Sequence, residues 1–406
     1  TNSPTSATMS QEVYIVECVR TPIGRGYSNG MLSSLVSSDL LALTLTELVA
    51  RAKIDKAEVE DIVCGCVTPI YEQGGNIGRF AALKAGFPVH VPGIQINRLC
   101  GSSQHAIHFA SQAIAAGDMD CVIACGVEMM SRLPLQSDRL NAKTHGERFQ
   151  AHIKGYPFRF LHQGESAEMI ADQWGISRED MDTFSSLSHE RAHKATQNGY
   201  FKKQIVPITI KKEDGSVKVV TQDEGIRYPV DHQKLAQLKP AFRANGKVTA
   251  ANSSQISDGA SAVLLCSAAK VKQLGLTPRA RIISRVVLGS DPELMLTGPI
   301  PATKKALEKA KLTIDQIDVT EINEAFASVV LAWMKEFPSY DIKKVNPNGG
   351  AIAQGHPVGA TGCILMTKLV NELERSGGRY GLEVMCIGMG QATATIIENL
   401  STRAKL

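Results

Sequence analysis

The chain has 406 residues, and 43% of them are hydrophobic, so it can bury a large core in about two or three domains. The formal net charge is only +4, without the concentrated basic stripe that is typical of a nucleic-acid-binding protein. No apolar run approaches the roughly 20 residues that cross a bilayer, so we expect no membrane insertion.

The first half of the chain alternates helices with strands. Residues 50–62, ARAKIDKAEVEDI, indicate the end of a helix, an acidic turn and a strand. Residues 97–126 then run from a loop through the helix AIHFASQAIAA to the strand CVIACG. Cys100 lies in that loop, in NRLCGSS, directly before the helix. The helix dipole there is expected to lower the thiol pKa and favour a nucleophilic thiolate; a buried structural cysteine is the alternative.

Residues 128–247 have a different character. They hold many aromatic and basic residues and few strand-like runs, with helices expected over 166–174 (SAEMIADQW) and 177–195 (SREDMDTFSSLSHERAHKA). The stretch is either a solvated surface excursion or a lid that holds a cofactor tail. We expect three units: residues 9–127 with 248–275, the inserted 128–247, and 276–406.

The second half repeats the first. Residues 308–320, EKAKLTIDQIDVT, resemble 50–62 at an offset of 258 residues. A loop, a helix and the strand VMCIGMG follow between Asn348 and Gly390. The alternation favours parallel sheets covered by helices. Two such units facing one another would bring their glycine-rich loops to one cleft.

Three segments of the second half carry reactive or oxyanion-binding groups. Asn323 in EINEAFA is a candidate to orient a water or donate to an oxyanion, or else caps a helix. His356, in the small-residue loop GGAIAQGHPVG, is a candidate general base, or else a hydrogen-bonded turn residue. Cys386 in MCIGMGQ is a candidate second acid–base group, with the backbone N–H groups of its glycine turn facing an oxyanion; simple packing is the alternative.

The cysteines indicate a reducing compartment. They number nine, which is odd, and several lie in strand-like runs, so no disulfide scaffold is expected. Cys64 and Cys66 alternate along one side of a strand and no CxxC pair occurs, so we expect no metal site. The nine are Cys18, Cys64, Cys66, Cys100, Cys121, Cys125, Cys266, Cys363 and Cys386.

Taken together, NRLCGSS, NEAFA, GGAIAQGHPVGATG and CIGMGQ resemble, in this order, the motif set of the thiolase family. The resemblance spans Val13 to about Glu398 and is strongest to degradative 3-ketoacyl-CoA thiolases. It implies an α/β fold of duplicated βαβ halves, layered α-β-α-β-α, with an inserted loop domain that binds CoA.

The resemblance also implies an acyltransferase that cleaves 3-ketoacyl-CoA with CoA, giving acetyl-CoA and a shortened acyl-CoA, and that runs the reverse Claisen condensation. Cys100, activated by His356, would form the acyl-enzyme, and Cys386 would protonate the departing enolate. One oxyanion site would use His356 with a water held by Asn323. The other would use the backbone N–H groups of Cys100 and Gly388.

CoA and acyl-CoA are then substrates, with no cofactor permanently bound. The residues that the resemblance assigns to CoA are His162, Arg227, Leu238, Phe242, Ala250 and Ser254. Their alternative roles are loop packing and, for Arg227, a surface salt bridge. The chain departs from the family at Gln163, where many relatives carry methionine near the acyl pocket.

Several alternatives stay open. An acetoacetyl-CoA (biosynthetic) thiolase shares these motifs, and a decarboxylating ketoacyl synthase shares the fold but lacks the second cysteine. By analogy we expect a homodimer or a dimer of dimers, paired through the N-terminal half. A multienzyme partner in fatty acid β-oxidation remains open. The location expected is the cytoplasm of a bacterial-type cell, while Ala404-Lys405-Leu406, one residue from the peroxisomal Ser-Lys-Leu signal, leaves the peroxisome open.

Overall fold

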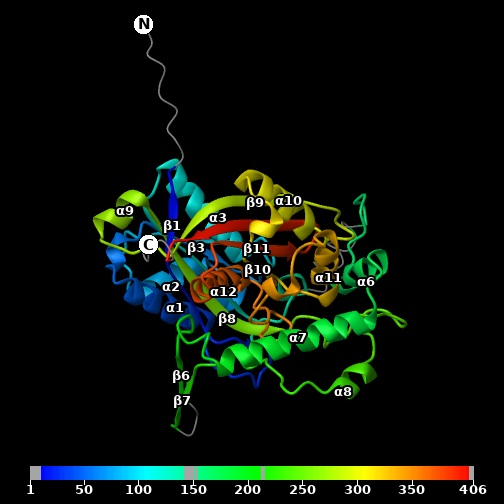
Figure 1. Cartoon of the computed structure of the whole chain (residues 1–406). Coiled ribbons are helices and arrows are strands. Elements are labelled where there is room, and N and C mark those ends of the chain that lie inside the picture. The colour runs from blue at the N-terminus through cyan, green and yellow to red at the C-terminus, as the bar shows by residue number, and fades with distance from the viewer. Residues whose placement is uncertain (1–10, 141–150, 152–153, 212–214, 402–406) are drawn as a thin grey trace.

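The computed structural model describes residues 11–140, 151, 154–211 and 215–401, so the C-terminal tripeptide 404–406 lies outside it. Its main feature is a ten-stranded mixed sheet covered by helices, with the inserted segment packed along one side (Figure 1). No helix of the described ranges is both long and apolar enough to cross a membrane.

The N-terminal half contributes one end of this sheet. Its strands are β1 (Val13–Arg20), β2 (Gly24–Arg25), β3 (Asp61–Gly65), β4 (Ile94–Ile96), β5 (Cys121–Met129) and β8 (Ser257–Ser267). Its helices are α1 (Ser37–Ala52), α2 (Ile77–Lys84), α3 (Ser102–Ala116) and α9 (Ala268–Gln273). Short 3₁₀ turns lie at Lys56–Glu58 and Tyr71–Gln73.

The C-terminal half contributes the other end. Its strands are β9 (Ala280–Gly289), β10 (Val319–Ile322), β11 (Tyr380–Ile387) and β12 (Gln391–Asn399). Its helices are α10 (Pro299–Ala310), α11 (Ala327–Glu336) and α12 (Thr361–Ser376), with 3₁₀ turns at Ile314–Gln316 and Ile342–Lys344.

The two halves have the same topology, as the internal repeat predicts. The sheet runs β1-β8-β5-β3 in one half and β9-β12-β11-β10 in the other, and each series has two antiparallel pairings followed by a parallel one. Helix α1 ends at Ala52 and α10 at Ala310, 258 residues apart, and each is followed by a lysine in the left-handed region.

The expectation of parallel sheets was only partly correct. Only the β3–β4, β3–β5 and β10–β11 pairings are parallel. Residues 388–390 join β11 to β12, and an antiparallel pair needs no more than such a tight turn, whereas a parallel pair needs a crossover helix. The helices predicted from the alternation connect the parallel strands. Strands β8 and β12 pair antiparallel, and no alternation of helix and strand in the sequence indicates them.

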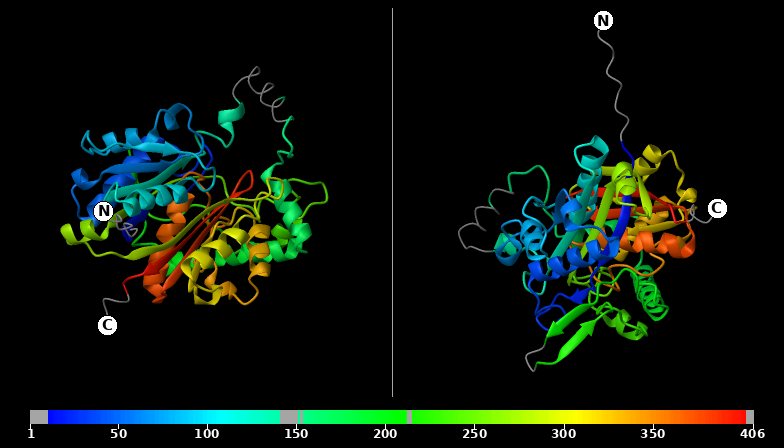
Figure 2. Two further views of the ribbon diagram at one scale, coloured as in Figure 1. Left: turned by 90° about the horizontal axis from the view of Figure 1, so that it is seen from above. Right: turned by 90° about the vertical axis from the view of Figure 1, so that its left-hand side faces the viewer.

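The layers follow the predicted α-β-α-β-α order. Helices α3 and α12 lie between the two half-sheets, and their apolar side chains share one core cluster with strands of both halves. Helices α1 and α2 cover the outer face of the N-terminal half-sheet, and α10 and α11 that of the C-terminal one. Figure 2 shows the two halves side by side, blue to cyan and yellow to red. Residues 361–373 of α12 are all buried because sheets contact it on both sides.

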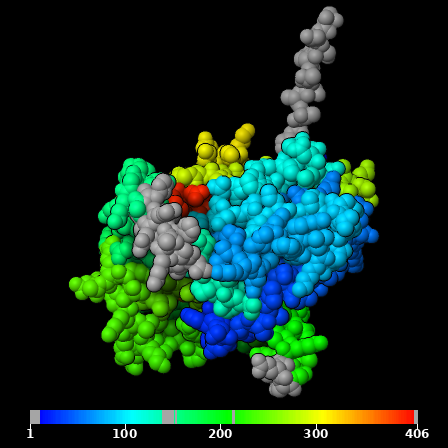
Figure 3. Space-filling view, turned by 180° about the vertical axis from the view of Figure 1, so that it is seen from behind, coloured from blue at the N-terminus to red at the C-terminus, as the bar shows by residue number. Residues whose placement is uncertain are grey.

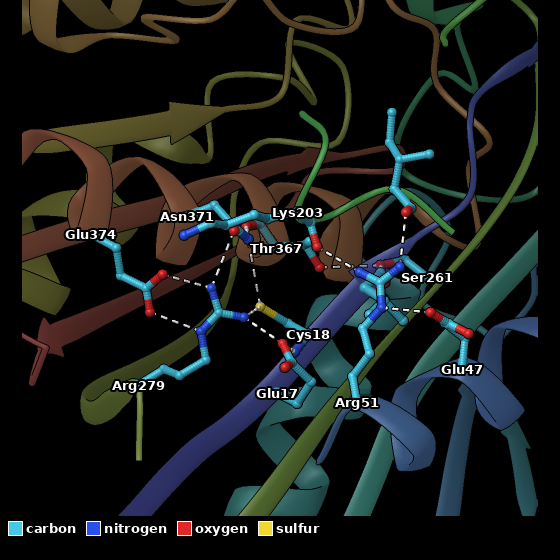
Figure 4. A network of polar contacts seen from close by, with 12 residues as sticks. Glu17, Cys18, Glu47, Arg51, Lys203, Ser261, Arg279, Thr367, Asn371 and Glu374 are labelled. Carbon is cyan, nitrogen blue, oxygen red and sulfur yellow. Dashed lines mark hydrogen bonds and ion pairs between the residues drawn. The ribbon is translucent and has the colours of Figure 1, made fainter. Parts of the chain in front are cut away.

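An arginine joins the halves where the sheet is narrowest. Strands β1 and β9 pair only at Tyr14–Arg281 and Ile15–Ala280. Just before β9, the Arg279 guanidinium donates to both carboxylate oxygens of Glu374 in α12, at 2.8 Å each (Figure 4). It also donates to Glu17 in β1. One partly buried cation therefore ties both half-sheets to the central helix layer.

The inserted segment is more ordered than expected. It contains α4 (Ser137–Leu140), α6 (Gln163–Gln173), α7 (Arg178–Gln197), α8 (His232–Gln237) and the β6–β7 hairpin (Ile208–Lys211, Val217–Val220). Helix α7 matches its prediction, with a capping box between Ser177 and Asp180. Helix α6 starts at Gln163, three residues before the predicted 166, because the His162 ring accepts from the Gly164 N–H and caps it.

We predict that Arg279→Met lowers the free energy of unfolding by about 2 kcal/mol, because it leaves the partly buried carboxylates of Glu17 and Glu374 without their cation. Urea unfolding followed by circular dichroism measures the change. Arg159→Met is the matched control, since Arg159 pairs with Glu293 at the surface and should shift the midpoint little. Equal effects of the two substitutions would contradict a structural role for the junction.

Candidate active site

Four of the residues singled out in the sequence converge where the two halves meet. Cys100 lies in the loop before α3 and His356 in the loop before α12, while Asn323 follows β10 and Cys386 ends β11. All four are at least 95% buried. Asn323 Nδ2 lies 3.4 Å from His356 Nε2 and 3.9 Å from Cys386 Sγ. Cys100 is close enough to Cys386 for a charge on Cys100 to raise the pKa of Cys386, so a group of the N-terminal half meets groups of the C-terminal half.

Hydrogen bonds fix the tautomer of His356. The Thr361 hydroxyl donates to the Pro357 carbonyl at 2.9 Å, so its oxygen must accept from His356 Nδ1–H at 2.6 Å. The lone pair then lies on Nε2, where it accepts from Asn323 Nδ2. Burial lowers the pKa of His356 to about 4, so the imidazole is neutral at neutral pH. A neutral ring with an outward Nε2 lone pair is the form that a general base requires.

The Cys100 thiol differs from its expectation. Burial raises its pKa to about 11 and outweighs the helix dipole, so the predicted lowering does not hold for the unliganded protein. The backbone N–H of Gly388 and the side-chain amide of Gln163 donate toward the sulfur and oppose this rise. Because the thiol is protonated at neutral pH, a nearby base is needed to activate it.

Cys386 is more strongly perturbed. Burial raises its pKa, and a negative charge on Cys100 raises it further, while the hydrogen bond from Asn323 lowers it. The two thiols therefore sense each other, and both cannot ionise together at low cost. One proton can shuttle at Cys386 while Cys100 carries the covalent chemistry.

Asn323 does not cap a helix, since α11 begins at Ala327. Its backbone N–H donates to the Val384 carbonyl at 3.0 Å, which holds it between β10 and β11. The side-chain Oδ1 is buried and has no hydrogen-bond partner among the residues that the structure describes. That oxygen can accept from a substrate group or a water.

Glycines allow the loops to approach one another. A Cβ on Gly101 would lie 2.3 Å from Ile387 Cδ1, so the Cys100 loop packs against β11 only without a side chain there. A Cβ on Gly388 would lie 2.7 Å from Gln163 Nε2 and 3.2 Å from Leu99 Cδ1. The turn after Cys386 is thus in direct contact with the loop that carries Cys100.

Two supporting residues were missed by the sequence argument. Thr361, five residues after His356 in GHPVGATG, sets the imidazole tautomer. Glu128 is fully buried, and its carboxylate accepts from the backbone N–H groups of Val67 and Thr68 and from that of Gly359 in the histidine loop. A single acidic residue in the apolar strand β5 was the signal that could have revealed Glu128.

The residues assigned to CoA fall into two groups. His162 stacks on Phe242 at 5.0 Å between ring centroids, and Phe242 meets Phe326, next to the Asn323 loop, edge-on at 5.9 Å. Ser254 donates its backbone N–H to the Ala325 carbonyl at 2.9 Å. This group therefore borders the catalytic cluster.

Arg227, Leu238 and Ala250 form the second group, and all three are exposed. The Arg227 backbone N–H donates to His189 in α7, and the Leu238 carbonyl accepts from Arg178 in the same helix. Arg227 and Leu238 lie on the inserted segment and Ala250 just after it, and no hydrogen bond within the described ranges joins them to the cluster of Cys100, His356, Asn323 and Cys386.

We predict that alkylation of Cys100 by iodoacetamide accelerates about tenfold per pH unit between pH 7 and 10, because the thiolate fraction grows tenfold per unit below a pKa of about 11. Mass spectrometry identifies the alkylated cysteine, and Cys100→Ala is the blank. A rate that levels off near pH 8 would mean that burial does not dominate this thiol.

Comparison with known proteins agrees with this arrangement. The family models "Thiolase, N-terminal domain" and "Thiolase, C-terminal domain" match residues 13–269 and 276–399. The chain is 48% identical to steroid 3-ketoacyl-CoA thiolase FadA6 of Mycobacterium tuberculosis, over 96% of this chain and 94% of that protein. It is 45% identical to a 3-ketoacyl-CoA thiolase of Aliivibrio fischeri, over 96% and 99%.

Solved structures give the same result. The Bacillus anthracis acetyl-CoA acetyltransferase superposes with a TM-score of 0.89 at 39% identity, covering 97% of this chain and 100% of that one. Human mitochondrial 3-ketoacyl-CoA thiolase superposes with a TM-score of 0.88 at 34% identity, with the same coverage. Sequence, fold and site together establish that the chain belongs to the thiolase family of acyltransferases.

Proposed function

We propose that the chain cleaves 3-ketoacyl-CoA with CoA, giving acetyl-CoA and an acyl-CoA shortened by two carbons. The observation that carries the proposal is the convergence of Cys100, His356, Asn323 and Cys386 in one buried cluster. The relatives named 3-ketoacyl-CoA thiolase support the choice of substrate class.

In the first step His356 Nε2 takes the Cys100 proton, and the thiolate attacks the 3-keto carbon. The oxyanion that forms accepts from backbone N–H groups of Cys100 and Gly388; removing one donor of this kind typically costs about 10²–10³-fold in rate. The C2–C3 bond then breaks, leaving an acyl group on Cys100 and an enolate of acetyl-CoA. Cys386 gives its proton to C2 of the enolate, and acetyl-CoA then leaves the site.

In the second step the Cys386 thiolate takes the proton of a CoA thiol, and the CoA sulfur attacks the Cys100 thioester. The tetrahedral intermediate collapses with Cys100 as leaving group, and protonated His356 returns its proton to the Cys100 sulfur, which restores the free enzyme. Splitting the reaction in this way replaces one difficult carbon–carbon cleavage with two acyl transfers. His356, with a water held by Asn323, would hold the thioester oxygen of acetyl-CoA, where the enolate charge develops.

The CoA moiety would lie along the inserted segment. In the three-part division 9–127 with 248–275, 128–247 and 276–406, the middle unit and the start of 248–275 would supply the walls. His162, Ala250 and Ser254 would line the pantetheine arm, with Phe242 and Leu238 near its outer end. Arg227, exposed and cationic, would meet the nucleotide phosphates. No cofactor beyond these substrates is required.

An acetoacetyl-CoA thiolase working in the biosynthetic direction is the second candidate, favoured by the structural similarity to an acetyl-CoA acetyltransferase. The same residues serve both directions because the chemistry is reversible. The two candidates differ in the length of acyl chain that the pocket accepts.

We predict that the wild type cleaves a panel of 3-ketoacyl-CoA substrates, from acetoacetyl-CoA upward, in a CoA-dependent reaction. The loss of the enolate absorbance of the substrate measures the cleavage. Cys100→Ala should abolish cleavage because no acyl-enzyme can form. Cys386→Ser should lower kcat by about 10²–10⁴-fold, since a hydroxyl is a poor proton shuttle at this position. Cleavage restricted to acetoacetyl-CoA would favour the biosynthetic candidate.

Two controls keep the result interpretable. The Cys386→Ser protein should still be alkylated at Cys100, which separates loss of the proton shuttle from misfolding. Titration of free thiol tests whether CoA is consumed. Turnover without CoA consumption would point to a decarboxylating ketoacyl synthase and contradict the proposal.

The chain would work as a homodimer or dimer of dimers through its N-terminal half. Strand β4 is a free sheet edge in the described ranges, and Ile94 on it is 49% exposed. Phe80 and Leu83 on α2 and Val89 between the two elements are also exposed. They belong to the N-terminal half, the blue-to-cyan face of Figure 3. Such an apolar edge is typical of an interface.

We predict that Ile94→Lys with Phe80→Glu converts the assembly to monomers, because both charges would be desolvated at a twofold interface. Light scattering after gel filtration measures the mass. Leu43→Lys, also at an exposed apolar position but on α1, is the matched control and should leave the mass unchanged. An unchanged mass in the double variant would place the interface elsewhere.

Such an enzyme would serve fatty acid β-oxidation and lipid metabolism, where 3-ketoacyl-CoA thioesters arise. A cytoplasmic location is proposed because bacterial relatives are prominent among the matches. The thioester substrate has to be supplied by a dehydrogenase that oxidises a 3-hydroxyacyl-CoA, so a multienzyme partner of that class is a natural neighbour.

A further inference from the structure

Gln163 faces the nucleophile from the inserted segment. It is the first residue of α6, is half-buried, and its Nε2 would lie 2.7 Å from a Cβ placed on Gly388, whereas its Cδ would lie 3.8 Å away. The nitrogen end of the amide therefore points at the glycine turn. Leu99, the neighbour of Cys100 in the chain, reaches the same point, since its Cδ1 would lie 3.2 Å from that Cβ. The amide therefore lies beside the loop that carries Cys100, and a hydrogen bond from Gln163 lowers the pKa of the Cys100 thiol.

The position of this amide is fixed by its neighbours. His162 caps α6 by accepting from the Gly164 N–H at 3.1 Å and stacks on Phe242. A Cβ on Gly164 would lie only 2.2 Å from Phe242, so the ring lies directly on the helix start. Ser166 donates to the Glu293 carbonyl at 2.6 Å and holds the next turn. The helix start cannot rotate away from Cys100 without breaking these contacts.

An amide beside a buried sulfur has a definite chemical effect. Gln163 carries no charge, so its N–H can donate to a thiolate without competing with His356 for the proton. A donor hydrogen-bonded to an ionised acceptor stabilises it more than the neutral form. This matters here because burial opposes ionisation of Cys100, and the hydrogen bond from Gln163 acts in the opposite direction.

We propose that Gln163 is a catalytic residue whose side-chain N–H donates to the Cys100 sulfur and stabilises the thiolate that attacks the substrate. The proposal rests on the proposed function, in which Cys100 is the nucleophile. It assigns to the inserted segment a part in the chemistry as well as in CoA binding. The sulfur then has donors from two separate elements, the Gly388 turn and the start of α6.

The test compares two nearly isosteric variants, Gln163→Met and Gln163→Glu, with the wild type. Methionine removes the donor, and glutamate replaces it with a negative charge beside the sulfur. We expect the rate of Cys100 alkylation at pH 9 to fall about tenfold or more in Gln163→Met and further in Gln163→Glu. The value of kcat/KM for thiolysis should fall in the same order, with the KM for CoA little changed.

Gln173→Met is the matched control. Gln173 is the last residue of the same helix, about 15 Å from Gln163 by the helix rise, and it is exposed. It should alkylate and turn over like the wild type. Urea unfolding of all variants shows whether the fold is retained.

Unchanged alkylation in a folded Gln163→Met protein would overturn the proposal. If only the preference for acyl chain length changed, Gln163 would be a wall of the acyl pocket and the proposal would be wrong. Alkylation of Cys100 requires no turnover, so it tests Gln163 independently of the proposed function. If the wild type cleaved no 3-ketoacyl-CoA but Gln163→Met still slowed alkylation, the proposed function would be wrong and the role of Gln163 toward the sulfur would stand.

Discussion

The packing of α3 against α12 between the two half-sheets is the constraint on which the rest of the molecule depends. The two helices pack against each other in the layer between the half-sheets, and α12 contacts strands of both halves, so most of the surface of each helix is buried. Since the halves are duplicates, the two helices begin at equivalent points. The loops that precede them therefore meet, and the nucleophile of one half is placed beside the base and second thiol of the other.

That placement buries ionisable side chains and therefore shifts their pKa values toward the neutral forms. Two thiols and an imidazole that are all buried are poorly solvated, so the thiol pKa values rise and that of the imidazole falls. Neutral groups at rest then suit a reaction in which each charge appears only briefly. The donors that receive those charges are backbone N–H groups and amides, which need no reorganisation when the charge develops.

Much of the fold was predictable because duplication leaves a constant offset in the sequence. The repeat located α1 and α10 and the strands that follow them, and the small-residue motifs located the catalytic loops. The antiparallel strands β8 and β12 were not predictable from the alternation. Strand β12 returns through a short turn with no crossover helix, and β8 is separated from its partner β5 by the inserted segment. The Cys100 pKa was predicted in the wrong direction because a helix start is visible in the sequence whereas desolvation is a property of the assembled core. Thr361 and Glu128 act through contacts with residues whose proximity only the fold reveals.

The inserted segment imposes an order on folding. Strand β1 pairs with β8, so that Val13 lies opposite Ser267, and residues 130–256 lie between β5 and β8 in the chain. During synthesis the N-terminal half-sheet cannot close until β8 has left the ribosome, and pairings between such distant strands form slowly. Cys100 is made early, whereas His356 and Cys386 are made near the end. With the roles proposed above, the newly made chain carries its nucleophile for most of synthesis without the base that activates it, and the reaction becomes possible only when the last strands dock.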